Sequence, residues 1–298
     1  VPITLTKNPW STPNLINELA TYAMGEAGKE AFSLGNDPVA LTNHRVDSFS
    51  GGSDHIIYAD PSINIPCCML GQWPDLNYHT ATDTLDVIDP EVLKFSCLTA
   101  INFAYNLANL RAEDLPFLFE ELEKNIVDEK TKLAAAFLNG KIDRDMFGSK
   151  MFKYKRYYLD SLKTAGRLVE GADTSAEEAN VSAMFDSWFR TYGINDSFVT
   201  CCELDTVYKR NFVGPIQGLD DYRALGKGEI LDAFNEKLKG GDRFAMYEVE
   251  SNVVYYIDGK RTLGEIVREV SLDSCTDRKE LVLLFVDTLE KLGLISEV

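Results

Sequence analysis

Apolar and polar residues alternate at strand spacing near the start of the chain and at helical spacing over most of its length. Ile3–Thr6 has the alternation of a short strand, and Leu15, Leu19 and Tyr22 then recur on one face of a predicted helix. The apolar run Ile65–Leu70 predicts a buried core strand. The first part of the chain therefore combines strand and helix signals.

The segments between these elements complete the pattern of a layered domain. Residues 34–53 are rich in Gly, Asn, Asp and Ser, which predicts loops with one edge strand. Asp54–Tyr58 predicts a short helix, and Asp89-Pro90-Glu91 begins a longer helix that extends to about Leu110. The alternation predicts that residues 1–110 belong to an α/β layered domain.

Beyond residue 110 the apolar spacing becomes mainly helical. Residues 242–298 contain short helical patterns followed by Leu294-Ile295, which resembles a winged helix-turn-helix module. We therefore predict three units, at 1–110, 111–241 and 242–298. The helices predicted in the middle unit cover 115–138, 143–170, 175–193 and 228–239.

Charge and cysteine content narrow the functional class. Among 298 residues, 47 are acidic and 30 basic, and the net charge of −17 disfavours nucleic-acid binding. There is no apolar run of the length that spans a membrane. The six cysteines lack C-x-x-C spacing, which favours reduced thiols and a cytoplasmic location. The chain begins with Val1 inside what reads as a strand region, so we expect it to be the C-terminal part of a longer protein.

One predicted helix, 143–170, carries basic and aromatic residues together. A nucleic-acid surface is one interpretation of this segment. An amphipathic helix with packed aromatics and solvated lysines is the favoured one. The residues concerned are Lys150, Phe152, Lys153, Tyr154, Lys155, Arg156, Tyr157 and Tyr158.

Two of the three histidines lie on either side of the Ile65–Leu70 run. His79 follows Tyr78 and precedes Asp83 by four residues. Neutral imidazole is the commonest biological zinc ligand, and a nearby carboxylate usually orients it. A tight loop here could present His79 to a metal while Asp83 and neighbouring threonine hydroxyls hold the loop.

His55 lies next to Ser53 and Asp54 and follows two glycines. Either histidine alone is more often a structural residue than a ligand. Together, on either side of one strand, they favour a shared pocket at the edge of the sheet.

These residues occur in an ordered pattern: Gly-Ser-Asp-His at 52–55, Ile-Pro at 65–66, Tyr-His-Thr-x-x-Asp-Thr at 78–84, then Asp89. The pattern resembles the C-terminal signature of the zinc aminopeptidases of family M twenty-eight, which also includes glutaminyl cyclases and non-catalytic relatives. The resemblance is close over 52–89 and looser over 1–110. The later helical and winged-helix-like parts look similar to bacterial members with an appended domain.

The resemblance implies a site with two zinc ions at the rim of a mixed sheet, acting on peptide or aminoacyl substrates. His79 matches the last zinc ligand of the family. The family's other ligands and its glutamate general base cannot be placed in this chain. Glu120-Glu121 and Glu177-Glu178 lie in predicted helices and read as solvated. The expected pocket residues are Ser53, Asp54, His55, Tyr78 and Asp83.

One imidazole cannot hold a catalytic zinc, which takes about three protein ligands. The chain alone is therefore expected to be inactive. Either a missing N-terminal portion or a second chain completes the site, and a homo-oligomer is one possibility. The alternative is a non-catalytic peptidase-fold scaffold that binds protein; a DNA-binding regulator is disfavoured by the acidic tail.

Overall fold

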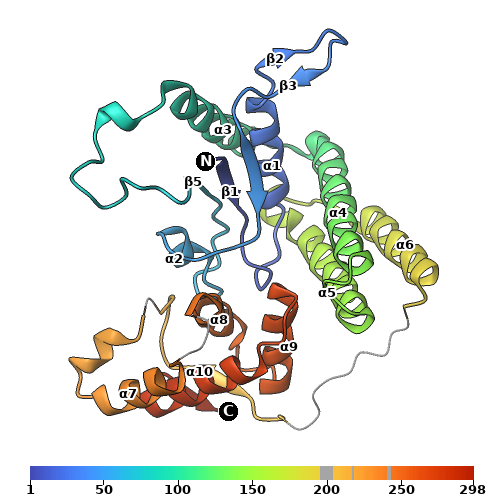
Figure 1. Ribbon diagram of the computed structural model, residues 1–298. Coiled ribbons are helices and arrows are strands. Elements are labelled where there is room, and N and C mark those ends of the chain that lie inside the picture. The colour runs from blue at the N-terminus through green and yellow to red at the C-terminus, as the bar shows by residue number, and fades with distance from the viewer. Residues whose placement is uncertain (195–203, 217, 240–242) are drawn as a thin grey trace.

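The computed structural model describes residues 1–194, 204–216, 218–239 and 243–298. Helices predominate, and a small mixed sheet lies near the N-terminus (Figure 1). This confirms the mixed α/β class. None of the helices in the described ranges is both long enough and apolar enough to cross a membrane. The strands are β1 (Ile3–Thr6), β2 (Ala31–Phe32), β3 (Pro38–Val39), β4 (His44–Asp47), β5 (Met69–Gln72), β6 (Tyr208–Arg210) and β7 (Ile295–Glu297).

Ten α-helices of the described ranges surround these strands, several with the predicted bounds. The predicted helices at 115–138 and 175–193 correspond to α4 and α6, and the one at 143–170 is α5 with a following 3₁₀ turn. The helices are α1 (Ile16–Ala27), α2 (His55–Ala59), α3 (Pro90–Asn109), α4 (Leu115–Leu138), α5 (Arg144–Leu162), α6 (Ser175–Tyr192), α7 (Gly228–Lys237), α8 (Arg243–Tyr256), α9 (Leu263–Ser274) and α10 (Lys279–Leu292).

The N-terminal sheet has the order β4-β1-β5. The central strand β1 runs parallel to β4, with Ile3 opposite His44, and antiparallel to β5, with Ile3 opposite Gln72. Ile3 and Leu5 point to the same face and are buried together with Phe95 of α3 and apolar residues of α1. One face of the sheet is therefore covered by α1 and α3.

The core strand predicted at Ile65–Leu70 is displaced. Pairing begins only at Met69, and Ile65 is 53% exposed. Pro66 has no N–H to donate to a ladder, and the Cys67 N–H is directed to the side-chain oxygen of Asn8 at 2.6 Å. The run therefore approaches the sheet as an extended segment and joins it late, as an edge strand.

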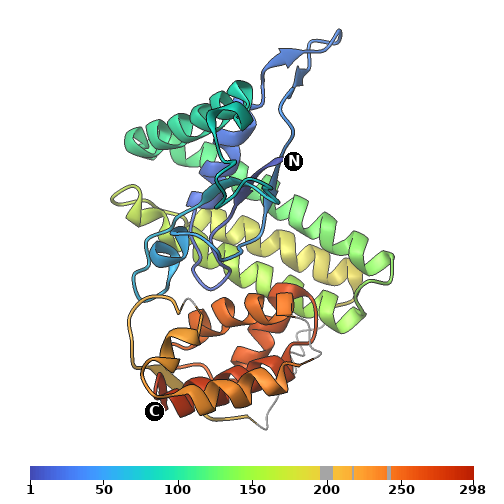
Figure 2. The same ribbon diagram turned by 60° about the vertical axis from the view of Figure 1, so that its left-hand side comes forward.

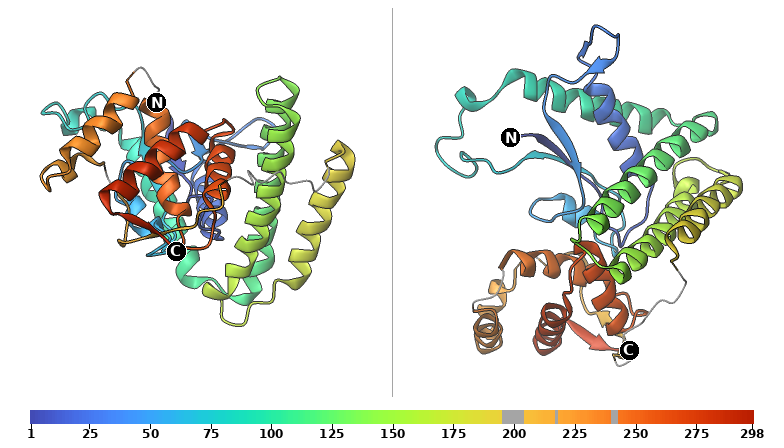
Figure 3. Two further views of the ribbon diagram at one scale, coloured as in Figure 1. Left: turned by 90° about the horizontal axis from the view of Figure 1, so that it is seen from below. Right: turned by 45° about the vertical axis from the view of Figure 1, so that its right-hand side comes forward.

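The helices α4, α5 and α6 pack side by side around an aromatic core (Figures 1 and 3). Trp10, from the loop after β1, contacts Tyr154 and Tyr157 of α5, with ring centroids 5.1 and 4.6 Å apart. Asp143 accepts a hydrogen bond from the Met146 N–H at the start of α5, as an N-cap does. The predicted packing of the α5 aromatics is confirmed.

The C-terminal unit combines α7–α10 with the β6–β7 pair (Figure 2). Thr262 and Glu265 form the capping box that begins α9. Tyr208 and Phe234 lie in the same core as α8–α10, so this core includes residues that precede 242. The predicted boundary at 241–242 and the pair Cys201-Cys202 lie outside the described residues, whereas Cys67, Cys68, Cys97 and Cys275 are free thiols.

Two lysines of α5 are buried, which corrects the expectation that the lysines of this helix are solvated. Lys153 is 2% exposed, and its ammonium group lies 3.0 Å from a carboxylate oxygen of Glu269 and also pairs with Asp273. It donates further hydrogen bonds to the Tyr256 hydroxyl at 2.9 Å and to the Glu269 carbonyl at 3.0 Å. Lys150 donates to the Leu272 carbonyl near the end of α9.

A second set of contacts joins the C-terminal unit to the sheet. Arg210 of β6 donates two hydrogen bonds, at 2.8 and 2.9 Å, to the carboxylate of Asp60, which follows α2. This pair is almost fully buried. The Tyr255 hydroxyl of α8 donates to the Ile56 carbonyl of α2 at 2.9 Å. The C-terminal unit is therefore held by buried polar contacts on two sides.

Replacing Lys153 by Met should destabilise the protein by roughly 3–5 kcal/mol, because two carboxylates lose their buried counter-ion. Chemical denaturation measures the effect. The matched control is Lys155→Met on the same helix, since Lys155 pairs with a half-exposed Asp186, and its cost should stay below about 1 kcal/mol. Equal effects of the two substitutions would contradict the assigned role of Lys153.

Acid should weaken the same contact. Burial alone would raise the pKa of Glu269, but Lys153 and Arg156 lower it to about 2 from 4.5. The folded pKa is depressed, so this stabilisation is present above pH 4.5 and is lost as the pH falls towards 2. We expect a loss of about 3 kcal/mol over that window, from 2.5 pKa units. Glu269→Gln should lose stability at neutral pH and show a shallower acid profile in urea titrations.

Candidate functional site

The His79 loop follows β5 and is held by side-chain hydrogen bonds of its own. The Thr80 hydroxyl donates to the Asn77 carbonyl at 2.7 Å, and the Thr82 hydroxyl donates to the Asn77 side-chain oxygen at 3.0 Å. The Asp83 N–H donates to the Thr80 carbonyl at 3.3 Å. The threonine hydroxyls thus hold the loop as predicted, whereas Asp83 contributes through its backbone.

His79 adopts a left-handed backbone conformation, with φ of 58°. Few residues other than glycine do so, and such conformations concentrate at functional sites. The imidazole is exposed and stacks on Tyr78, with ring centroids 3.8 Å apart. Among the described residues, no hydrogen bond engages either ring nitrogen of His79, so both are available to a ligand.

His55 has a different environment. It is buried on α2, its Nε2 donates to the Ser50 carbonyl at 2.8 Å, and its ring contacts Phe49 at 5.5 Å between centroids. Burial lowers the pKa of His55, which favours the neutral ring. The adjacent Ser53 and Asp54 are exposed at the start of α2.

The structure does not bring the two histidines into one pocket. The chain leaves β4 at Asp47, opposite Thr6, and reaches α2 at that end of the sheet. It leaves β5 at Gln72, opposite Ile3, at the other end. The His79 loop therefore extends away from the C-terminal helices, whereas α2 lies beside them (Figure 1). Ser53, Asp54 and His55 lie at one end of the sheet, and Tyr78, His79 and Asp83 at the other.

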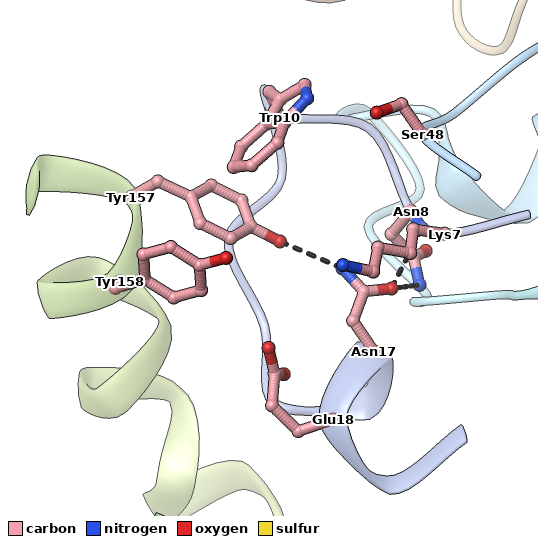
Figure 4. Close-up of a pocket in the computed structure, with 8 residues that line it drawn as sticks. All are labelled: Lys7, Asn8, Trp10, Asn17, Glu18, Ser48, Tyr157 and Tyr158. Atoms are coloured by element: carbon pink, nitrogen blue, oxygen red, sulfur yellow. Dashed lines mark hydrogen bonds between the residues drawn. The ribbon is translucent and has the colours of Figure 1, made fainter. Parts of the chain in front are cut away.

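A polar pocket that the sequence did not predict lies where β1 ends. Lys7 and Asn8 reach it from the loop after β1, Asn17 and Glu18 from α1, and Tyr157 from α5 (Figure 4). Its cavity volume is about 10 Å³, room for about one water molecule. The remaining lining residues are Trp10, Ser48 and Tyr158.

Hydrogen bonds fix most of the polar groups of this pocket. The Asn17 side chain donates to the Tyr157 hydroxyl at 2.9 Å and accepts from the Asn8 N–H at 2.9 Å. Glu18 is the exception, since one of its carboxyl oxygens is buried without a hydrogen-bond partner among the described residues. Burial raises the pKa of Glu18 to about 7, although Lys7 acts in the opposite direction.

One signal in the sequence points to Glu18. Leu15, Leu19 and Tyr22 define the apolar face of α1, and residue 18 lies three positions after Leu15 on that face. A carboxylate at such a position is either exposed at the border of the face or buried and perturbed. Only the packing of α4 and α5 against α1 decides that Glu18 is buried.

Substitution of His55 by Ala should cost roughly 1–3 kcal/mol, because it removes a buried ring that packs beside Phe49 and donates to the Ser50 carbonyl. His79→Ala removes an exposed ring and should change stability by no more than about 0.5 kcal/mol. Urea denaturation of both variants measures the difference. Equal stabilities would contradict the structural role given to His55.

No protein-family model, curated protein or solved structure matches this chain. Within the described ranges, no three His, Cys, Asp or Glu side chains gather in a group that could hold a metal ion. A metal at His79 therefore requires ligands beyond those that the described residues bring together.

Proposed function

We propose that this chain is the C-terminal portion of a zinc-dependent aminopeptidase-like metallohydrolase, and that His79 supplies one of its metal ligands. The observation that carries this assignment is the imidazole of His79, exposed in a left-handed loop conformation with both nitrogens unengaged by the described residues. It occupies the position at which the Tyr-His-Thr-x-x-Asp-Thr motif is expected to present a ligand.

The residues fit a zinc site only in part. A catalytic zinc takes about three protein ligands and keeps one position open, and the described residues offer His79 alone. The remaining ligands and the general base are assigned to polypeptide outside residues 1–298, either upstream sequence or a second chain. Zinc in such a site would activate water against the carbonyl of an N-terminal peptide bond.

The open edge of the sheet supports completion by further strands. The β4 edge carries the ion pair Arg45–Asp47, at 2.9 Å, and charge of this kind protects an edge from pairing. The strand β5 has no charged residue, and the chain on either side of it exposes Ile65 and Trp73. Strands added at β5 would run next to the segment that leads to His79.

The helix α3 supports the same conclusion. Its inner side is buried at Phe95 and Thr99, yet its outer side exposes Leu93, Ile101 and Tyr105. A helix that is apolar on both sides is usually buried on both. We infer that the outer side of α3 and the β5 edge are covered in the complete protein.

The second candidate is a non-catalytic scaffold that retains the peptidase-like α/β part and binds protein through a winged-helix-like C-terminal unit. The arrangement of α8–α10 beside the β6–β7 pair favours it, because such a unit presents a folded surface independent of any metal. The acidic balance of the chain favours a protein partner over DNA. The two candidates differ in one respect: only the hydrolase retains a complete ligand set and a general base.

The test uses the complete protein, with every polypeptide that accompanies these residues. Loaded with zinc, it should cleave an aminoacyl-anilide, and His79→Ala should lower both the zinc content and the turnover at least tenfold, since an aligned ligand contributes more than about 1.4 kcal/mol to binding. Elemental analysis gives the metal content per folded protein.

The matched control is His55→Ala, the same change at the other end of the sheet, which should keep its zinc. Normal zinc stoichiometry in His79→Ala would refute the ligand assignment. A complete wild-type protein that neither binds zinc nor hydrolyses the anilide would favour the scaffold.

A further inference from the structure

We propose that Glu18 and the cavity beside it form a proton-operated lock. This lock joins the sheet and its helix α1 to the helices α4 and α5. The lock is closed when the Glu18 carboxyl is protonated and loosens when it ionises. It lies at the end of the sheet away from the His79 loop and does not depend on a metal.

One carboxyl group, that of Glu18, is buried in the seam where α1 packs against α4 and α5. Glu18 projects from α1 towards α5 and is 1% exposed (Figure 4). Tyr157 and Tyr158 of α5 line the opposite side of the pocket and are themselves buried. One Glu18 oxygen has no hydrogen-bond partner among the described residues, and the neighbouring cavity has room for about one water molecule.

The charges around Glu18 do not neutralise it. Among the described residues, Lys7 from the loop after β1 is the cation that acts on Glu18, and Lys7 also donates to Glu129 of α4 at 3.3 Å. From the segment before β5, the Cys68 thiol faces the same region, and burial raises its pKa to about 12, so it stays neutral. The Tyr157 and Tyr158 hydroxyls also stay neutral, because burial raises their pKa values. Glu129 also pairs with Lys132 at 3.6 Å. Lys7 lies between two carboxylates, and an ionised Glu18 would share Lys7 with Glu129.

The sign of the effect follows from the direction of the shift. The pKa of Glu18 rises from 4.5 to about 7 on folding, chiefly through burial. The stabilisation is complete below pH 4.5 and is lost as the pH rises through 7. A shift of this size weakens the folding equilibrium on the order of a hundredfold between those limits.

The seam connects to the C-terminal unit through one helix. The same α5 that carries Tyr157 and Tyr158 also carries Lys150 and Lys153, which hold α9. A weaker contact between α5 and α1 would therefore also affect the C-terminal helices, although Glu18 does not touch those helices. Protonation of one buried carboxyl would set how firmly the two parts of the chain are joined.

The test compares wild type, Glu18→Gln and Glu26→Gln. Glu26 lies on the same helix but is partly exposed and paired with Lys29, so it receives the same chemical change outside the seam. The urea midpoint of wild type and of Glu26→Gln should fall as the pH rises from 4.5 to 7. The midpoint of Glu18→Gln should fall less and exceed that of wild type at pH 8.

Two further measurements on wild type keep the outcome decisive if the variant folds poorly. Carbon-13 NMR of labelled glutamate should show one carboxyl carbon titrating near pH 7, and amide exchange in α5, corrected for its intrinsic pH dependence, should accelerate through the same midpoint. Any of three results would overturn the lock. The urea midpoints of wild type and Glu18→Gln could change with pH in parallel, the Glu18 carboxyl could titrate with a midpoint near 4.5, or amide exchange in α5 could be independent of that titration.

Discussion

The attachment of α9 to α5 through two buried lysine side chains constrains the whole molecule. A lysine ammonium loses its hydration on burial, so it must meet charge and hydrogen-bond acceptors in the protein. Lys153 meets Glu269 and Asp273, and Lys150 meets a carbonyl near the C-terminus of α9, where the helix dipole favours a positive charge. Lys150 and Lys153 are three residues apart, so one face of α5 supplies both groups. The orientation of the C-terminal unit is thereby fixed by directional contacts, which tolerate less sliding than an apolar interface.

This attachment gives the two ends of the sheet different roles. The end where β1 and β4 finish is closed. There Asp60 accepts from Arg210 of β6, the Ile56 carbonyl accepts from Tyr255 of α8, and Asn17 donates to Tyr157 of α5. The end where β5 finishes is open, and there the loop of residues 73–84 extends with its histidine exposed. A ligand site at the open end can be completed by additional protein, whereas the closed end transmits changes between parts already present. The proposed metal site at His79 and the proposed proton-linked lock at Glu18 therefore share no residue.

Local signals in the sequence were sufficient for most of the helices. Pro90 after an Asp cap, the Asp143 cap of α5 and the Thr262 capping box each mark a helix start, and local chain chemistry alone determines them. Long-range contacts decided the rest. The late start of β5 depends on Asn8 capturing a backbone N–H, and the burial of Lys153 depends on carboxylates more than a hundred residues away. No local pattern contains that information.

The prediction that His55 and His79 share a pocket failed for a different reason, because the topology of a single strand already argues against it. A strand carries the chain from one end of a sheet to the other, about 3.3 Å for each residue. Residues immediately before and after a single strand therefore lie at opposite ends unless the chain turns back. The late entry of the chain into the sheet at Met69 obscures this, because the nine residues between α2 and β5 could have turned back and do not.

The exposed apolar side chains beside β5 and on α3 bear on both proposed functions. Trp73, next to the β5 edge, and Leu93, Ile101 and Tyr105 on the outer side of α3 are exposed apolar side chains on a chain whose net charge is −17. Excess negative charge opposes non-specific self-association. It does not pair the backbone N–H and C=O groups along the outer edge of β5, which carries no charged residue. A specific cover satisfies both conditions, because strand pairing supplies the missing hydrogen bonds and apolar packing removes α3 from water. Both proposed functions expect such a cover. The two proposals are therefore separated best by whether the covering polypeptide carries zinc ligands, and less well by any residue of this chain.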